Sequence, residues 1–394
     1  VEGNEAVNSA FIVEHADIIV GSNYSPAQLK RATKRLQEVG VFDSVVVSTS
    51  DRPSADGSVA VVIEVSERKP RTIGFGVTAE NFEGFGVEGF WKHRNLFGNA
   101  ESLRAEASIG RIGQGGFGDL DYHADLLFKK PNAIGPATSF EARATFDVAN
   151  TNAFNKRSGK ISASLSNGLR DDLPVKGGIA AEYAVVDDGV TVSNTAALST
   201  PISLTYDTRN NALNPTSGWF ATLSTEPTYV HPSRATFVKS SVEASTYLAL
   251  DDDERLVLAA RAAMGTIIGT NIANVPADRR FFAGGGGSIR GYGFQMAGPL
   301  TGGGKPQGGL SHLEASAEAR YKVTDDIGVV GFIDTGGAFT SNIPGQGGSL
   351  YTGVGGGVRY YTPIGPIRAD IAFPLNKIAG QPQYGLYLGI GQAF

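Results

Sequence analysis

Apolar and polar residues alternate with a period of two through most of the chain, from about residue 72 to residue 394. Each alternating segment is followed by turn residues, a combination typical of β-strands joined by short connections. No helical period is found in this region. The pattern predicts sixteen strands, at residues 72–80, 84–94, 101–112, 117–129, 137–149, 158–169, 176–188, 194–207, 218–230, 234–249, 254–268, 309–323, 326–339, 350–362, 365–374 and 383–394.

The first 70 residues follow a different pattern. Ser25 is a suitable helix N-cap, Pro26 fits the first helical position, and Gln28 would complete a capping box. Apolar residues then recur at helical spacing, at Leu29, Ala32, Leu36 and Val39. Gly40 stands where a left-handed glycine commonly ends a helix.

The remainder of this region completes a small α+β domain. An earlier helix is expected at about residues 8–18, and two strands are expected at residues 42–49 and 58–66. The predicted domain, residues 1–70, therefore runs helix, helix, strand, strand. We expect this domain to lack a first strand, whose place would be before Val1.

The polar faces of the predicted strands carry many charged residues. A large soluble sandwich or propeller would also alternate. Its filled core could not hold Glu, Arg, Lys and Asp on strand after strand, whereas the wet lumen of a membrane barrel can. Residues 71–394 are therefore predicted to form a 16-stranded antiparallel transmembrane β-barrel. The long connection at residues 269–309 would lie opposite the small domain, and short connections would lie beside it, as in outer-membrane barrels.

Composition excludes several function classes. The chain has 394 residues, 52 glycines and no cysteine, so disulfides, thiolate nucleophiles and Cys-ligated zinc are excluded. The net charge of −5 argues against a nucleic-acid partner, because binding phosphates requires a basic surface. No apolar run approaches the roughly 18 residues of a membrane-spanning helix. The mean hydropathy of −0.09 fits the average of an apolar outer face and a polar inner face.

Three patterns resemble ligand or catalytic motifs but lack the context that those motifs need. Residues 113–118 have the spacing G-x-G-x-x-G, yet strands are expected on both sides and no helix follows. The acidic residues 251–254 do not have EF-hand spacing and fit a solvated turn. The five histidines are scattered. We therefore predict no catalytic residue, no metal site, no cofactor and no enzymatic activity.

The long connection contains the most informative segment. Four consecutive glycines, residues 284–287, are followed by Arg290, which is flanked by Ile289, Gly291 and Tyr292. Glycine lets backbone turn sharply or approach closely. We interpret the segment as a loop folded back into the lumen. The alternative is a flexible glycine-rich loop with an exposed arginine.

A guanidinium inside the lumen needs carboxylate partners, since a buried arginine is tolerated only when paired. Two carboxylates on the polar faces of following strands could serve. They are Glu318, on the strand directly after the loop, and Asp334, on the next strand.

Several segments resemble those of the POTRA-plus-barrel superfamily of outer-membrane assembly and translocation proteins. Residues 287–292 resemble its loop motif, and residues 332–336 resemble its later-strand motif, whose Asp pairs with the loop Arg. The helix–helix–strand–strand region resembles a POTRA domain, here the last of a truncated series. Three further segments are similar to the family: residues 94–98, 206–218 and 362–366.

Within the superfamily the compact barrel most resembles the TamA group, with the BamA group as the alternative. The resemblance implies a bacterial outer-membrane location with the POTRA domain in the periplasm. It implies insertion or translocation of outer-membrane proteins, including substrates of the autotransporter type. The implied partners are unfolded outer-membrane proteins, outer-membrane lipid and, through the POTRA region, an inner-membrane-anchored protein like TamB.

The seam between the first and last strands suggests a mechanism, because it determines how easily a barrel opens. The first strand begins with Ile73, Gly74, Phe75 and Gly76, and the last contains Gly385, Gly389, Gly391 and Phe394. Glycine weakens a strand interior. Our hypothesis is lateral opening, in which strand edges are offered to an incoming chain. The glycines could equally relieve crowding, and a passive porin or a two-partner secretion pore is the other class of function.

Overall fold

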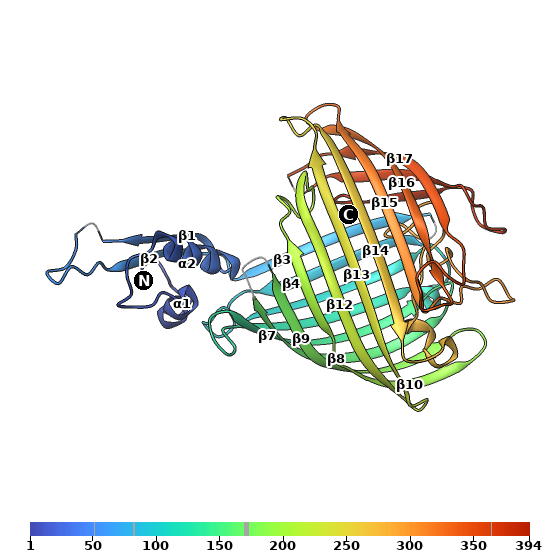
Figure 1. The fold of residues 1–394 in the computed structure, drawn as a ribbon, viewed down its shortest axis with the longest axis horizontal. Coiled ribbons are helices and arrows are strands. Elements are labelled where there is room, and N and C mark those ends of the chain that lie inside the picture. Colours follow the sequence, from blue (N-terminus) through green and yellow to red (C-terminus); the bar gives the residue numbers. More distant parts are fainter. Residues whose placement is uncertain (51, 82, 169–172, 364) are drawn as a thin grey trace.

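The structure is a computed structural model that describes residues 1–50, 52–81, 83–168, 173–363 and 365–394. A small domain of two helices and two strands lies at one end of a large β-barrel (Figure 1). The N-terminus lies in the small domain.

The small domain has the predicted order of elements. It consists of α1 (Ser9–Ala16), α2 (Pro26–Glu38), β1 (Phe42–Thr49) and β2 (Val61–Glu67). Apolar residues from both helices and both strands form one core, which also takes in Ala100 of the barrel. Burying these side chains stabilises the domain by roughly 1.5–3 kcal/mol for each large one.

The ends of α2 agree only in part with the prediction. Ser25 is the N-cap residue and Pro26 the first helical residue, but the Ser25 side chain makes no capping hydrogen bond, so the predicted capping box is wrong. The backbone oxygen of Ser25 accepts from the Gln28 and Leu29 N–H groups instead. Gly40 has the expected left-handed conformation, with φ of +77°.

The barrel closes through seventeen strand segments that occupy sixteen positions. The segments β10 and β11 share one position, because both pair with β9 and β12 and only residues 200–201 interrupt them. The strands are β3 (Arg71–Glu80), β4 (Gly84–His93), β5 (Ser102–Ile112), β6 (Asp121–Pro131), β7 (Thr138–Asn150), β8 (Asn155–Gly168), β9 (Pro174–Asp187), β10 (Val192–Ser199), β11 (Ile202–Asp207), β12 (Ser217–His231), β13 (Ala235–Ala249), β14 (Leu256–Ile268), β15 (Ser311–Lys322), β16 (Ile327–Phe339), β17 (Tyr351–Tyr360), β18 (Ile367–Pro374) and β19 (Gly385–Ile390).

The two faces of the strands differ as the alternation predicted. On β15 the charged residues Glu314, Glu318 and Arg320 are buried inside the barrel, while Ala317 and Tyr321 are exposed on its outer face. A wet or ion-paired interior and an apolar exterior suit a membrane barrel. None of the helices in the described residues is long and apolar enough to cross a membrane.

The barrel closes at a very short seam. β3 and β19 form only two residue pairs, Tyr387 with Glu80 and Leu388 with Ala79. By comparison, β12 and β13 pair continuously over residues 217–230 and 235–248. The last strand is also shorter than predicted, because residues 383–394 were expected and β19 spans only Gly385–Ile390.

Candidate functional site

The long connection between β14 and β15 lies at the barrel end opposite the small domain (Figure 1) and turns inward. Two short 3₁₀ turns, Ile272–Asn274 and Ala277–Arg279, lead into it, and Phe281 forms a bridge with Gly309. The loop tip at residues 289–292 is almost completely buried. An exposed flexible loop, the alternative interpretation, does not fit this placement.

Arg290 lies against both carboxylates that the sequence singled out. Its Nε and Nη2 donate to the two oxygens of Asp334, at 2.7 and 2.9 Å, and its backbone N–H donates to the same carboxylate at 3.2 Å. Its Nη1 forms an ion pair of 2.7 Å with Glu318. The Arg290 side chain is 2% exposed, and the two carboxylates are at most 1% exposed. The fork geometry of the guanidinium therefore reaches two carboxylates on neighbouring strands.

The sequence missed a third carboxylate, Asp370 on β18, which lies 3.6 Å from Arg290 Nη1. Asp370 is also ion-paired with Arg359 of β17, and Glu318 with Arg320 at 2.8 Å. Asp370 lies on the inward parity of the segment 367–373, so strand alternation offered a signal for it. The Phe332 ring completes the site, with its centroid 3.4 Å from the guanidinium carbon.

The neighbours of Arg290 fix the loop tip through other contacts. Ile289 is fully buried in a small apolar cluster. Gly291 has φ of +97°, and its N–H donates to the Tyr387 hydroxyl at 2.9 Å. The Tyr292 hydroxyl donates to the Thr352 carbonyl at 2.9 Å. All four predicted motif residues therefore contact the barrel wall or the loop core.

Glycines on β17 provide the space for this docking. Gly353, Gly355 and Gly357 face the lumen at alternate positions. A Cβ at Gly353 would overlap the backbone oxygen of Arg290, and one at Gly357 would overlap the Asp370 carboxylate. These residues form a groove in the wall that only glycine allows.

A second set of ion pairs holds the root of the loop on another part of the wall. Lys156 of β8 contacts both Glu182 of β9, at 2.7 Å, and Asp278 of the loop, at 3.0 Å. Arg279 contacts Glu182 at 2.5 Å and Glu226 of β12 at 3.8 Å. We call these five residues the root cluster. Tip and root together attach the loop to strands on different parts of the barrel, so the loop crosses the lumen.

The predicted seam residues fall into two groups. On β3, Ile73 and Phe75 are exposed outward, Phe75 to 83%. A Cβ at Gly74 would overlap the inward-facing ring of Phe90, and one at Gly76 the Glu88 side chain. None of the four pairs with β19, since only Ala79 and Glu80 do.

On the other side of the seam, Gly385 packs against the Tyr387 hydroxyl and Gly389 lies beside Arg368. Gly391 has φ of +90°, which turns the chain away from the wall. Phe394 is consequently not a strand residue, contrary to the prediction. It packs inside the barrel against a cluster that includes Tyr247 and Val257.

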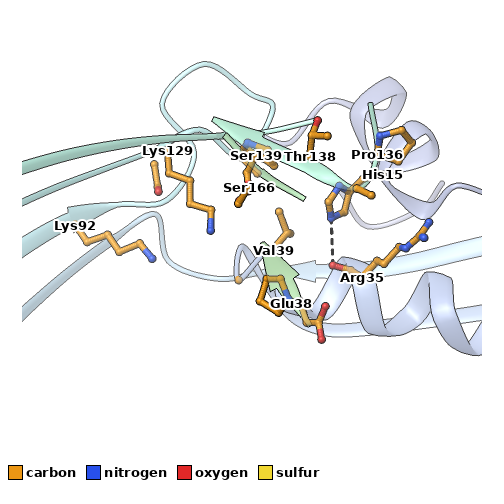
Figure 2. A pocket seen from close by; sticks show the side chains of 16 residues that line it. His15, Arg35, Glu38, Val39, Lys92, Lys129, Pro136, Thr138, Ser139 and Ser166 are labelled. Carbon is orange, nitrogen blue, oxygen red and sulfur yellow. Dashed lines mark hydrogen bonds between the residues drawn. The ribbon is translucent and has the colours of Figure 1, made fainter. Parts of the chain in front are cut away.

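The family-like segment 94–98 has a role that its sequence did not indicate. Asn95 donates to the Ala6 carbonyl at 2.9 Å, and the Gly98 carbonyl accepts from the Asn8 N–H at 2.8 Å. This turn therefore docks the small domain onto the barrel. Beside it lies a cavity of about 480 Å³, into which Lys92 and Lys129 point from the barrel and His15 from α1 (Figure 2).

The other sequence patterns lie where expected. Residues 113–118 connect β5 and β6, and residues 251–254 connect β13 and β14. Of the family-like segment 362–366, Ile364 lies outside the described residues. Among the residues that the structure describes, no group of three or more acidic, His or Cys side chains could hold a metal ion.

Comparison with known proteins identifies similar families and folds. Residues 95–394 match the Omp85 superfamily domain, and residues 1–68 match a POTRA model described as a surface antigen variable number repeat. The chain is 26% identical, over 398 residues, to an outer membrane protein assembly factor BamA of Nitratidesulfovibrio vulgaris. The alignment covers 96% of this chain and 48% of that protein, so the chain spans about half the length of this relative.

Two solved structures have a similar fold. One is BamA from Haemophilus ducreyi lacking POTRA domains 1–3, with a TM-score of 0.77 and 18% identity, covering 98% of this chain and 82% of that one. The other is CdiB from Acinetobacter baumannii, with a TM-score of 0.69 and 13% identity, covering 99% and 72%.

Proposed function

Because this chain belongs to the Omp85 superfamily, as an outer-membrane β-barrel with a periplasmic POTRA domain, we propose that it inserts outer-membrane proteins through its seam. The incoming chain would pair with the free edge of β3 while β3 and β19 separate. Unfolded outer-membrane proteins are the proposed substrates, and outer-membrane lipid receives the product.

The two-pair seam is the observation that carries this proposal. Only Glu80 and Ala79 of β3 are paired with β19, so residues 71–78 present a strand edge. Unpaired strand edges bind further strands, and breaking two residue pairs costs much less than opening any long ladder of this barrel. The Asn81 side chain reinforces the seam, since its Oδ1 accepts from the Leu386 N–H at 2.8 Å.

A disulfide across the seam tests the proposal, and the chain has no cysteine of its own. Ala79→Cys/Leu388→Cys joins a paired position of β3 and β19. Ala262→Cys/Ala315→Cys joins a paired position of β14 and β15 and is the matched control. The assay is insertion of a small outer-membrane barrel into liposomes that contain the full chain. Only the oxidised seam variant should lose insertion, and reduction should restore it; insertion by the oxidised seam variant would refute lateral opening.

The choice between a TamA-like and a BamA-like role is a finer proposal. We favour the TamA-like role that the compact barrel suggested, with a TamB-like protein bound through the POTRA region. Co-purification of a TamB-like protein with the full chain, lost when residues 1–70 are removed, is the expected result. A BamA-like general assembly role predicts no such partner.

A secretion pore is the second candidate. The root cluster favours it, because its side chains are only partly buried, at 3–27% exposed, and a loop held there by partly solvated ion pairs could be displaced to open the lumen. Single-channel recordings of the protein with and without residues 275–305 separate the two functions. An occluded insertion machine should conduct little with its loop in place, whereas steady conductance of the intact protein would favour a pore.

A further inference from the structure

The last four residues of the chain lie away from the positions that the seam register would give them. Tyr387 pairs with Glu80 and Leu388 with Ala79, so each further residue of β19 would face the preceding residue of β3. Continued in this register, Gly391 would lie opposite Gly76 and Phe394 opposite Ile73. The chain instead leaves the wall at Gly391 and enters the lumen.

The diverted tail is held by specific hydrogen bonds. The Gly391 N–H still continues the β18–β19 pairing, donating to the Pro366 carbonyl at 2.7 Å, whereas the Gln392 N–H donates to the Leu213 carbonyl at 3.0 Å. The Gln392 side chain donates to Asn214 Oδ1 at 2.9 Å and accepts from Arg359 Nε at 2.8 Å. We call Leu213, Asn214 and Arg359 the tail latch.

Two of the three latch residues come from the opposite side of the barrel. Leu213 and Asn214 belong to the turn between β11 and β12, which lies half-way round the strand order from the seam. The turn is braced internally, because Asn211 Oδ1 accepts from the N–H groups of Leu213 (2.8 Å) and Asn214 (2.9 Å). The Leu213 side chain also lies next to Gly365 and Gly391. This turn therefore extends across the barrel mouth to the end of β19.

We infer that the β11–β12 turn acts as a latch that keeps the seam unzipped on the side of the small domain. The Gln392 backbone N–H, which the strand register would direct toward β3, can serve only one acceptor, so its bond to the Leu213 carbonyl replaces a bond to β3. When the latch holds the tail, residues 73–76 of β3 stay free for another strand. When it releases the tail, β19 can extend along β3 and close the seam. The competition between the latch and β3 for the tail does not depend on the proposed function. Only its consequence, a free edge of β3 for an incoming strand, rests on that function.

Disulfide trapping measures this competition directly. Val77→Cys/Ile390→Cys places cysteines at the second position beyond the present pairing, so their disulfide forms only when the seam zips further. The initial rate of disulfide formation is measured on the full chain in liposomes, without substrate. Asn214→Ala removes one latch hydrogen bond and should raise this rate about fivefold, the effect of one ordinary hydrogen bond.

A second latch variant and two controls accompany it. Gly391→Ala opposes the left-handed turn and should raise the rate by a similar factor. Thr340→Ala removes a side-chain hydrogen bond to the Gly347 carbonyl in the β16–β17 connection, at the other end of the strands from the tail, and should leave the rate unchanged. The pair Ala79→Cys/Leu388→Cys should react equally in all backgrounds and shows that each variant is folded.

The outcomes separate the latch from the proposed function. Unchanged trapping rates in both Asn214→Ala and Gly391→Ala would overturn the latch, whatever the insertion assay gives. Faster trapping together with slower insertion supports both the latch and lateral opening. Faster trapping with unchanged insertion supports the latch and counts against lateral opening alone.

Discussion

Replacing Arg290 by alanine should release the loop tip from the barrel wall without unfolding the barrel. Removing one partner of a buried ion pair costs about 3–5 kcal/mol, because the other charge stays buried and unpaired. Two of the three carboxylates keep a cation, since Arg320 pairs with Glu318 and Arg359 with Asp370. Only Asp334 has no other ion pair among the described residues. The cost should therefore fall at the lower end, about 3 kcal/mol.

The measurement is limited proteolysis with chymotrypsin, which would cut the loop at buried aromatic residues such as Phe281 and Tyr292. Cleavage follows the population of the opened loop when reclosing is faster than cutting. A loss of about 3 kcal/mol raises that population about a hundredfold, so the loop should be cut about a hundred times faster. Arg290→Lys keeps the charge but loses the fork, and should lie in between.

Arg143→Ala is the matched control for this experiment. Arg143 is also a lumen arginine in an ion pair, at 3.4 Å from Asp125, but its partner belongs to the wall and not to the loop. Its loss should leave loop cleavage unchanged. If Arg290→Ala is cut at a rate within twofold of the wild type, the ion pairs around Arg290 do not hold the loop.

Three other predictions follow from single contacts. Gly353→Ala should speed the same cleavage, because its methyl group would overlap the docked loop. Gly331→Ala, with open space around it, should not. Equal cleavage rates in the two variants would contradict the role of the β17 groove in docking the loop. Asn95→Ala should increase hydrogen exchange at the contact between the small domain and the barrel, while exposed Phe97→Ser should not. Burial raises the pKa of Glu83, in the β3–β4 turn, from 4.5 to about 7. The folded protein therefore retains a proton that the unfolded chain releases, and stability should fall as pH rises from 4.5 to 7; Glu83→Gln should reduce this fall in melting temperature.

Strand alternation predicted the barrel well because each strand obeys a local rule: every second side chain faces lipid. The same rule placed Glu318 and Asp334 in the lumen. It did not single out Asp370 as a partner of Arg290, because Asp370 alternates equally well but lies on a strand far from the loop in sequence. The end of β19 was missed for a similar reason. Phe394 continues the alternating pattern, and the chain end is diverted by contacts with residues distant in sequence, in the β11–β12 turn and on the barrel wall.

The loop tip and the chain end are joined by one row of polar contacts. Arg290 lies 3.6 Å from Asp370, Asp370 is paired with Arg359, and Arg359 donates to Gln392 at 2.8 Å. Asp370 and Arg359 are fully buried, so water screens neither charge effectively. A change in the charge around Arg290 therefore changes how strongly Asp370 attracts Arg359, and with it the hydrogen bond from Arg359 to Gln392. In this arrangement the loop in the lumen and the strand at the seam are positioned by the same buried charges, and neither can be displaced without changing the contacts of the other.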